Sequence, residues 1–352
     1  MNTKVVKIDP INPQEGYLKE AANILSRGGL VIMPTETVYG IAANASNQDT
    51  IDRLYKIKQR PKDKPFSLHI DEKSKVEDFA RTIPIYAYKL IDKFWPGPLT
   101  LILESRYMGS VGIRMPDNEI ALKVIALAGV PVVCPSANIF GKAAPINFAE
   151  AIKDMQGLVD FAMDAGSTEL QIESSVVDLT VWPLRILREG AIKKEDIENT
   201  ATKKTVLFIC TGNSCRSVMA QAILEKELKE NNRQDVEVLS AGIMMLSGLG
   251  ATEETKELLR KEGIDVSRHR SQKISKEILK KSDIILVMEK LHEESVLQLA
   301  PEVKNRLFLL KEFAKIDDDN LNIDDPIGRS IDFYAKTLEI IKEAIEGIAK
   351  II

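Results

Sequence analysis

The chain has 352 residues, which is long enough for two domains of about 150 residues each. Its net charge of −4 excludes the overall basic character typical of nucleic-acid-binding proteins, although local cationic patches remain open. The three cysteines, an odd number, argue against a disulfide framework. The N-terminus lacks the apolar core of a signal peptide, and no apolar run approaches the ~20 residues of a membrane span. We therefore expect a cytoplasmic protein.

The N-terminal half begins with an apolar strand, residues 28–33, that leads into the hydroxyl-rich turn Thr35-Glu36-Thr37. Residues 56–64 then concentrate five cations in nine positions. Two prolines, at positions 61 and 65, and the apolar stretch 66–70 favour a cationic loop that feeds a strand over a long solvated helix. Such a loop suits a polyphosphate ligand.

Further along this half, polar groups flank short apolar strands. Arg114 lies in the apolar strand 112–115, where its charge is costly unless paired, so we expect an anionic ligand or a buried carboxylate beside it. The tryptophan segment 94–100 predicts a rigid structural corner. Similar strand ends occur at residues 130–138, 173–178 and 186–190. The pattern predicts a strand-rich α/β domain with a deep cationic cleft, whose ligand is a nucleotide or a nucleic acid.

The apolar pattern lapses into charged and polar residues after Asp196. Residues 197–204 are read as a polar linker, because no apolar periodicity continues through them. We therefore predict a first domain over residues 1–196 and a second over residues 205–352.

The C-terminal half alternates apolar strands with amphipathic helices. The predicted strands are residues 205–209, 236–242, 283–288 and 307–310, and the predicted helices are residues 218–228, 253–262 and 331–352. This alternation predicts a doubly wound α/β domain, a parallel sheet with helices on both faces, whose ligand site lies beyond the carboxyl ends of the strands.

A cysteine-containing loop follows the first of these strands. Cys210 comes directly after the strand, and Gly212 and Asn213 can adopt left-handed conformations that turn backbone N–H groups inward. Arg216 can close the ring around a phosphoryl group, and the following helix directs its positive end at the same place. These groups favour the thiolate of Cys210 over the thiol, which predicts a nucleophile that faces a bound anion. The loop itself comprises Thr211, Gly212, Asn213, Ser214 and Cys215.

Asp325 is the candidate acid for this loop. Cleavage of a phosphate ester through a phosphocysteine needs a proton for the leaving oxygen, and a carboxylic acid beside the loop can supply it. Pro326 restricts Asp325 to extended geometry and so would hold it in place.

These motifs resemble the low-molecular-weight protein tyrosine phosphatase family over essentially all of residues 203–352. The resemblance rests on residues 206–224, 240–242, 267–270, 283–289 and 325–326. It implies that Cys210 attacks phosphorus, that Arg216 and the loop amides hold the phosphoryl oxygens, and that Ser217 bonds the thiolate. It also implies that Asp325 acts first as acid and then as base, and that Asn213 braces the loop.

Two positions depart from the phosphotyrosine enzymes of this family. Ser214 occupies a position where those enzymes usually have an aliphatic residue and the related protein arginine phosphatases have threonine. Ile327 stands after the Asp-Pro pair, where an aromatic residue often flanks the substrate ring. The implied substrate is therefore a phosphoprotein, and phosphotyrosine and phosphoarginine both remain open.

The motifs of the N-terminal half, taken in order over about residues 12–192, resemble the YrdC family of threonylcarbamoyl-adenylate synthases. The resemblance implies that L-threonine, bicarbonate and ATP yield L-threonylcarbamoyladenylate and pyrophosphate for tRNA threonylcarbamoyladenosine synthesis. Mg²⁺ would accompany the triphosphate, and no dedicated metal ligands are expected. Catalysis would rest on positioning and charge neutralisation, because no general base or covalent nucleophile is evident.

The resemblance also assigns site residues in this half. The implied contacts to threonine are Thr37, His69, Arg114, Ser136 and Ser174, with Arg114 pairing the carboxylate. The implied contacts to ATP are Lys58, Arg60, Lys64, Ser110, Asn138 and Arg188.

The chain is therefore interpreted as a bifunctional enzyme with independent active sites, which acts on small molecules and on a phosphoprotein. RNA or tRNA-modification proteins remain open as further partners. An alternative is an N-terminal RNA-binding module followed by a phosphate-sensing or inactive C-terminal domain. Few aromatic residues flank residues 56–64, which disfavours base stacking and hence this alternative.

Overall fold

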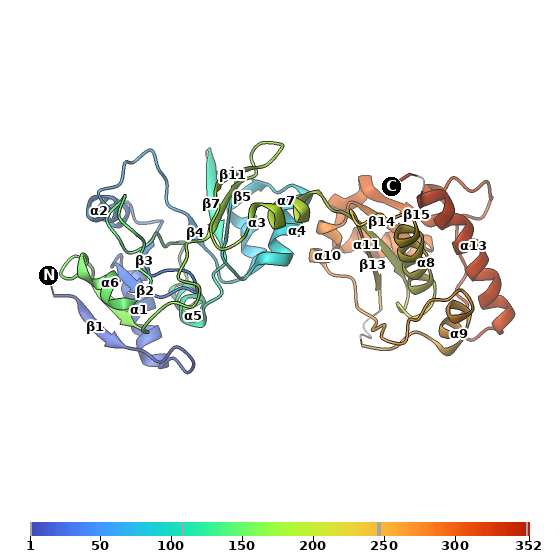
Figure 1. The fold of residues 1–352 in the computed structure, drawn as a ribbon, viewed down its shortest axis with the longest axis horizontal. Helices are drawn as coiled ribbons and strands as arrows, with labels where there is room; N and C mark the ends of the chain where they lie inside the picture. The colour runs from blue at the N-terminus through green and yellow to red at the C-terminus, as the bar shows by residue number, and fades with distance from the viewer. Residues whose placement is uncertain (1, 108, 245–247, 350) are drawn as a thin grey trace. The chain divides into compact units, whose positions relative to one another are not determined.

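The computed structural model describes residues 2–107, 109–244, 248–349 and 351–352, and the chain forms two compact units (Figure 1). The first unit is Met1–Ala201 and the second is Thr202–Ile352. Each unit has its own sheet and its own hydrophobic core.

The first unit is built on a mixed sheet with eleven strands within the described residues. Ten strands follow the order β1-β9-β2-β3-β8-β4-β7-β6-β10-β11, and β5 pairs with β6. The strands are β1 (Lys4–Lys7), β2 (Val31–Met33), β3 (Gly40–Asn44), β4 (Leu68–His69), β5 (Ala80–Thr82), β6 (Leu99–Ser105), β7 (Ser110–Arg114), β8 (Val132–Val133), β9 (Phe161–Asp164), β10 (Ser175–Asp178) and β11 (Arg185–Arg188). The predicted strand-rich α/β domain is confirmed.

Helices cover both faces of this sheet around β2. Val31 and Met33 pack in a cluster with α1 and α5, whereas Ile32 packs in a second cluster with residues of α2 and α6. This alternation follows from the two-residue side-chain period of a strand. The helical elements are α1 (Glu15–Ser26), α2 (Gln48–Lys58), η1 (Lys73–Lys75), α3 (Val76–Phe79), α4 (Ile85–Phe94), α5 (Glu119–Ala128), α6 (Phe148–Lys153) and α7 (Lys194–Thr202).

The cationic segment is only partly a loop. We expected residues 56–65 to lie outside a helix, but α2 continues through Lys58 and ends at Gln59, which is left-handed with φ 51°. The helix can extend this far because Leu54 and Lys58, one turn apart, are both buried. The remaining cations lie in the segment between α2 and β4, as predicted.

The second unit has a four-stranded, fully parallel sheet in the order β13-β12-β14-β15. Its strands are β12 (Lys204–Cys210), β13 (Val236–Gly242), β14 (Ile284–Val287) and β15 (Leu307–Leu309). Its helical elements are α8 (Arg216–Glu230), α9 (Glu253–Lys261), α10 (Lys276–Lys281), α11 (Lys290–Leu299), η2 (Pro301–Arg306), α12 (Leu310–Phe313) and α13 (Ile331–Ala349).

Alternate residues of β12 face opposite layers of this unit. Val206 and Phe208 pack with α8 and α13, which lie together in Figure 1, whereas Leu207 and Ile209 pack with residues of α10 and α11. Helices therefore cover both faces, and the predicted doubly wound parallel sheet is confirmed. Cys210 lies at the carboxyl end of β12, where this topology places ligands.

The polar segment predicted to be a linker is mostly helical. Residues 197–202 lie in α7, and only Lys203 separates α7 from β12. Ile197 and Ala201, which are four residues apart and buried, pack in the core of the first unit. The prediction of a linker over residues 197–204 was therefore wrong, because Ile197 and Ala201 anchor most of this segment as a helix on the core of the first unit.

Within the described residues, no helix combines the length and the apolar character needed to cross a bilayer.

Candidate active sites

The first unit contains a cavity of about 520 Å³ at the strand ends that carry the polar motifs. Most residues assigned to threonine or ATP from the sequence line this cavity. They are Lys58, Arg60, Lys64, His69, Arg114, Ser136, Asn138, Ser174 and Arg188. Side chains from distant parts of the sequence are thus brought together as expected.

Arg114 is held at one side of the cavity by a buried carboxylate. Its Nη2 atom lies 2.6 Å from Oε1 of Glu36 and donates to Oγ1 of Thr37 at 2.9 Å. The side chains of Arg114 and Glu36 are only 6% and 4% exposed. Of the two partners expected for Arg114, the structure shows the buried carboxylate. Nη1 makes no hydrogen bond to the described residues and remains available to a ligand.

Neutral hydrogen-bonding groups line the same cavity as Arg114. Burial, followed by the charge of Arg114, lowers the pKa of His69 to about 3, so its imidazole is neutral near pH 7. Oγ of Ser174 lies 3.0 Å from Oγ1 of Thr100 and accepts a hydrogen bond from Nη2 of Arg188 at 3.2 Å. Burial also raises the pKa of the Cys134 thiol in the cavity wall to about 12, which disfavours a thiolate nucleophile there.

Lys58 organises the turn after β8. It is 1% exposed, and its Nζ donates to the backbone oxygens of Ser136 at 2.5 Å and Asn138 at 2.7 Å. Burial, with a further contribution from Arg60, lowers the pKa of Lys58 to about 8. Lys58 therefore holds the backbone that presents Ser136 and Asn138 to the cavity.

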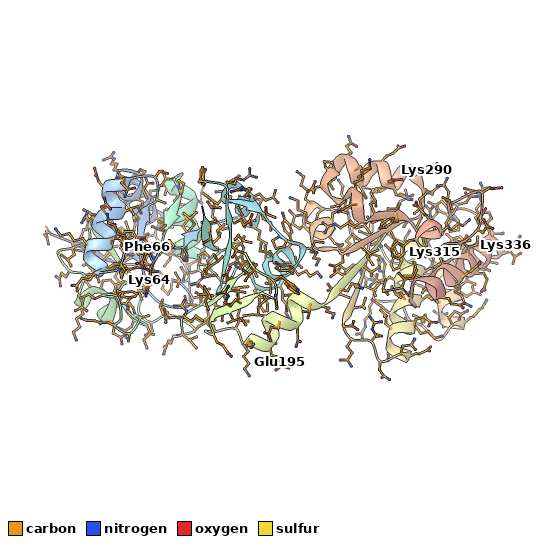
Figure 2. All side chains as sticks on the ribbon, turned by 90° about the horizontal axis from the view of Figure 1, so that it is seen from above. Lys64, Phe66, Glu195, Lys290, Lys315 and Lys336 are labelled. Atoms are coloured by element: carbon orange, nitrogen blue, oxygen red, sulfur yellow. The ribbon has the colours of Figure 1, made fainter. Side chains whose placement is uncertain are left out.

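Arg60 and Lys64 form a cationic rim on aromatic supports. The guanidinium of Arg60 lies 5.2 Å from the ring centroid of Phe66, and Nζ of Lys64 lies 4.8 Å from that of Phe140. Figure 2 labels Lys64 and Phe66 within this unit. Nε of Arg60 also donates to the Lys64 backbone oxygen at 2.9 Å. Within the part of the chain that the structure describes, neither cation has a carboxylate partner, which leaves their charge for an anion.

In the second unit, the loop after β12 wraps around the thiol of Cys210. Its Sγ atom lies 3.0 Å from Oγ of Ser217 and accepts the backbone N–H of Asn213 at 3.3 Å. Asn213 has φ 52°, the left-handed conformation expected from the sequence, whereas Gly212, for which the same conformation was expected, does not adopt it. Its Nδ2 group donates to Ser217 at 3.0 Å and to Oγ of Ser240 at 2.8 Å, so Asn213 braces the loop as predicted.

Gly242 allows the loop to lie against β13. A Cβ atom at this position would lie 2.8 Å from the Thr211 oxygen and 2.9 Å from the Asn213 nitrogen. Both atoms are backbone, so only glycine permits this approach.

Arg216 links the loop to two carboxylates. It is 1% exposed, and its Nη1 lies 2.5 Å from Oε2 of Glu289 while its Nη2 lies 2.5 Å from Oδ2 of Asp325. Nη2 also donates to Oγ1 of Thr211 at 3.1 Å. The loop arginine and the predicted acid are therefore neighbours, although they are far apart in sequence.

The two units match different known protein families. The family model Sua5_yciO_yrdC, described as "Telomere recombination", matches residues 23–190. The protein named "Putative threonylcarbamoyl-AMP synthase" of Methanocaldococcus jannaschii is 34% identical over 201 residues, which are 54% of this chain and 95% of that protein. The crystal structure of Pyrococcus abyssi Sua5 complexed with L-threonine matches with a TM-score of 0.55 at 26% identity, covering 87% of this chain and 99% of that one.

The model described as "Low molecular weight phosphotyrosine protein phosphatase" matches residues 205–352. The "Probable low molecular weight protein-tyrosine-phosphatase EpsP" of Ralstonia nicotianae is 34% identical over 144 residues, 41% of this chain and 92% of that protein. This chain belongs to both families. It also matches "Threonylcarbamoyl-AMP synthase" of Pyrococcus abyssi at 40% identity over 194 residues, 53% of this chain, but spans only 57% of that protein's length.

Two residues assigned in the synthase-family unit lie outside the cavity lining. Thr37 is fully buried and hydrogen-bonds Arg114, so it supports the cavity wall from behind. Ser110 lies at the exposed start of β7, paired with Glu104 of β6, at the opposite end of the strand from Arg114. Neither position places a hydroxyl among the residues that line the cavity.

Sequence reasoning also missed several residues at both sites. Glu36, in the turn after β2, was not predicted as a site residue, although a carboxylate beside an apolar strand indicates a buried ion pair. In the phosphatase-family unit, Glu289 follows β14 at the carboxyl edge of the sheet, which marks it as a site candidate. His292 lies inside α11, and nothing in the sequence around it indicates that its side chain contacts the loop after β12.

Proposed function

We propose that the first unit makes L-threonylcarbamoyladenylate and pyrophosphate from L-threonine, bicarbonate and ATP. The observation that carries this proposal is one cavity that is lined both by a buried, fixed Arg114 and by the cationic rim of Arg60 and Lys64. A small carboxylate ligand suits the first, and a polyphosphate suits the second. The threonine named with the Pyrococcus abyssi Sua5 structure is consistent with this assignment.

The chemistry follows from charge and position. The carboxylate of threonine pairs with Nη1 of Arg114, while its amine reacts with bicarbonate to give a carbamate and water. The carbamate oxygen then attacks the α-phosphorus of ATP, and the bond to the β-phosphate oxygen breaks to release pyrophosphate. Arg60, Lys64 and Arg188 offset the negative charge that grows on the phosphates.

Mg²⁺ would enter with ATP. The carboxylates that line the cavity among the described residues are Asp63 and Glu173, and Glu173 pairs with Arg188. Mg²⁺ in proteins is often held by substrate phosphates, water and one or two carboxylates. The cavity fits such an ion, which would neutralise phosphate charge.

The first unit is tested by pyrophosphate release. We expect release from ATP only when both L-threonine and bicarbonate are present, and we expect L-alanine to fail as a substitute. The variant Lys64→Ala should raise the KM for ATP by about 10-fold, because one phosphate contact is lost. Absence of threonine-dependent release would contradict the proposal and would favour an RNA-binding role, whereas release that does not depend on threonine would indicate a different nucleotide reaction.

We further propose that the second unit hydrolyses phosphoprotein through a phosphocysteine. Cys210 attacks phosphorus, and the leaving atom takes a proton from Asp325 as its bond to phosphorus breaks. Water then attacks the phosphocysteine and gives its proton back to Asp325, which frees inorganic phosphate and the thiolate. Arg216, beside both Thr211 and Asp325, is placed to hold the phosphoryl oxygens.

Two residues bear on which phosphorylated residue the second unit accepts. Ser214 is partly exposed, and its hydroxyl contacts Sγ of Cys215 at 3.6 Å. Ile327, which follows Pro326, is 53% exposed and offers an aliphatic flank. A polar loop position and a flank without an aromatic ring favour an aliphatic phospho-residue such as phosphoarginine over phosphotyrosine.

A peptide panel separates these substrates. We expect a higher kcat/KM for phosphoarginine peptides than for phosphotyrosine peptides of the same flanking sequence. The double variant Ser214→Ile/Ile327→Tyr should reverse the preference, because it supplies an apolar wall and an aromatic flank. A wild-type preference for phosphotyrosine would contradict the assignment.

We propose that the protein acts in the cytoplasm. The three cysteines are unpaired thiols, which fits a reducing compartment such as the cytoplasm. We propose that the adenylate product serves tRNA threonylcarbamoyladenosine synthesis and that tRNA-modification proteins or RNA receive it.

A further inference from the structure

His292 is a buried residue that contacts the phosphate loop from α11. It is 0% exposed, and its Nδ1 atom accepts the backbone N–H of Glu289 at 3.1 Å. Only an unprotonated ring nitrogen can accept a hydrogen bond, so the proton of the neutral ring lies on Nε2. Burial lowers the pKa of His292 to about 4, in keeping with a neutral ring near pH 7. The cap of α11 therefore sets the tautomer of His292.

This tautomer determines the direction of the hydrogen bonds at the Thr211 hydroxyl. Nε2 of His292 lies 3.0 Å from Oγ1 of Thr211 and, carrying the proton, must donate to it. Nη2 of Arg216 lies 3.1 Å from the same oxygen and can only donate. A hydroxyl oxygen has two acceptor lone pairs, and both are then occupied. The hydroxyl proton of Thr211 must therefore point away from His292 and Arg216.

No acceptor for this proton is found among the described residues. Thr211 is the residue directly after Cys210 and is partly exposed. The Arg216 nitrogen that bonds Thr211 also bonds Asp325, so the hydroxyl lies beside both the phosphate-holding group and the acid. A donor without a partner, fixed at this place, is suited to an oxygen of a ligand held by the loop.

We propose that Thr211 is a directed hydrogen-bond donor to the phosphoryl group in the loop and that His292 is the positioning residue that holds it in this role. The proposal deepens the phosphatase assignment and rests on it for the substrate. Binding of inorganic phosphate by the loop is a separate property, and it can be measured whether or not turnover occurs.

The test is calorimetric titration of inorganic phosphate into the full chain and its variants. We expect Thr211→Val to weaken phosphate binding by about 10-fold, the loss expected for one hydrogen bond to a charged group, because valine keeps the shape but lacks the donor. Thr211→Ser, which keeps the hydroxyl, should stay within about 3-fold of wild type. Equal affinity of wild type and Thr211→Val would overturn the proposal.

A second variant isolates the role of His292. His292→Asn can still accept the N–H of Glu289 through Oδ1, but it has no atom at the position of Nε2. We expect it to weaken phosphate binding by about 3-fold to 10-fold without shifting the thermal unfolding midpoint. The double variant Thr211→Val/His292→Asn should bind no more weakly than Thr211→Val alone, because His292 acts through Thr211. Additive losses would overturn the positioning role.

Turnover of 4-nitrophenyl phosphate distinguishes this inference from the proposed function. If wild type binds phosphate and hydrolyses the ester, kcat/KM should fall in the variants in parallel with phosphate affinity. If wild type binds phosphate but hydrolyses nothing, the phosphatase assignment fails, and the fall in affinity of Thr211→Val still supports the inference. If wild type does not bind phosphate, the inference is overturned.

Discussion

Replacing Cys210 by serine is expected to lower the phosphatase turnover number by about 10³-fold or more. A serine hydroxyl is not ionised near neutral pH, and the two groups that contact this position, Oγ of Ser217 and the N–H of Asn213, are not general bases that could activate an alcohol. Hydrolysis of 4-nitrophenyl phosphate by the full chain measures the effect. Turnover that survives in Cys210→Ser would rule out the phosphocysteine mechanism.

Cys215→Ser is the matched control in the same loop. Cys215 is as buried as Cys210, but its Sγ atom faces Thr252 at 3.5 Å and Tyr334 at 3.7 Å. Serine can replace it among these hydroxyl groups, so we expect activity within about 10-fold of wild type. Threonine-dependent pyrophosphate release should be unchanged in both variants, because they leave the residues of the first cavity intact.

The second large effect concerns the buried pair of Arg114 and Glu36. Arg114→Met leaves the Glu36 carboxylate buried without its cation, which should lower the free energy of unfolding of the first unit by about 3–5 kcal/mol. It should also abolish threonine-dependent pyrophosphate release, since the proposed carboxylate partner is gone. Urea unfolding followed by tryptophan fluorescence reports on this unit, because both tryptophans, Trp95 and Trp182, lie in it.

The double variant Arg114→Met/Glu36→Gln separates stability from function. Removing both charges should recover at least half of the lost stability, because no uncompensated ion remains buried. Activity should not return, since the cation is still absent. Recovery of pyrophosphate release in the double variant would show that Arg114 only offsets Glu36 and does not contact threonine.

The thiol loop shows how much of a site sequence reasoning can predict. Cys210, Asn213, Arg216 and Ser217 lie within eight consecutive residues, so local backbone geometry brings them together. The left-handed Asn213 was accordingly predicted and observed, and the helix predicted from residue 218 begins two residues earlier, at Arg216. The linker prediction failed because this segment depends on tertiary packing instead. The two buried residues of α7 are too few to reveal a helix in the sequence without their tertiary partners.

The sequence by itself determined the two families, the parallel sheet of the second unit and the nucleophile of its loop, because these depend on contiguous motifs and on hydrophobic periodicity. Only the tertiary structure decided that Glu36 neutralises Arg114, that Arg216 lies between Glu289 and Asp325, and that His292 orients Thr211. Each of these contacts joins residues that the sheet brings together from distant segments. Their energies depend on burial and on donor geometry, which no linear spacing specifies.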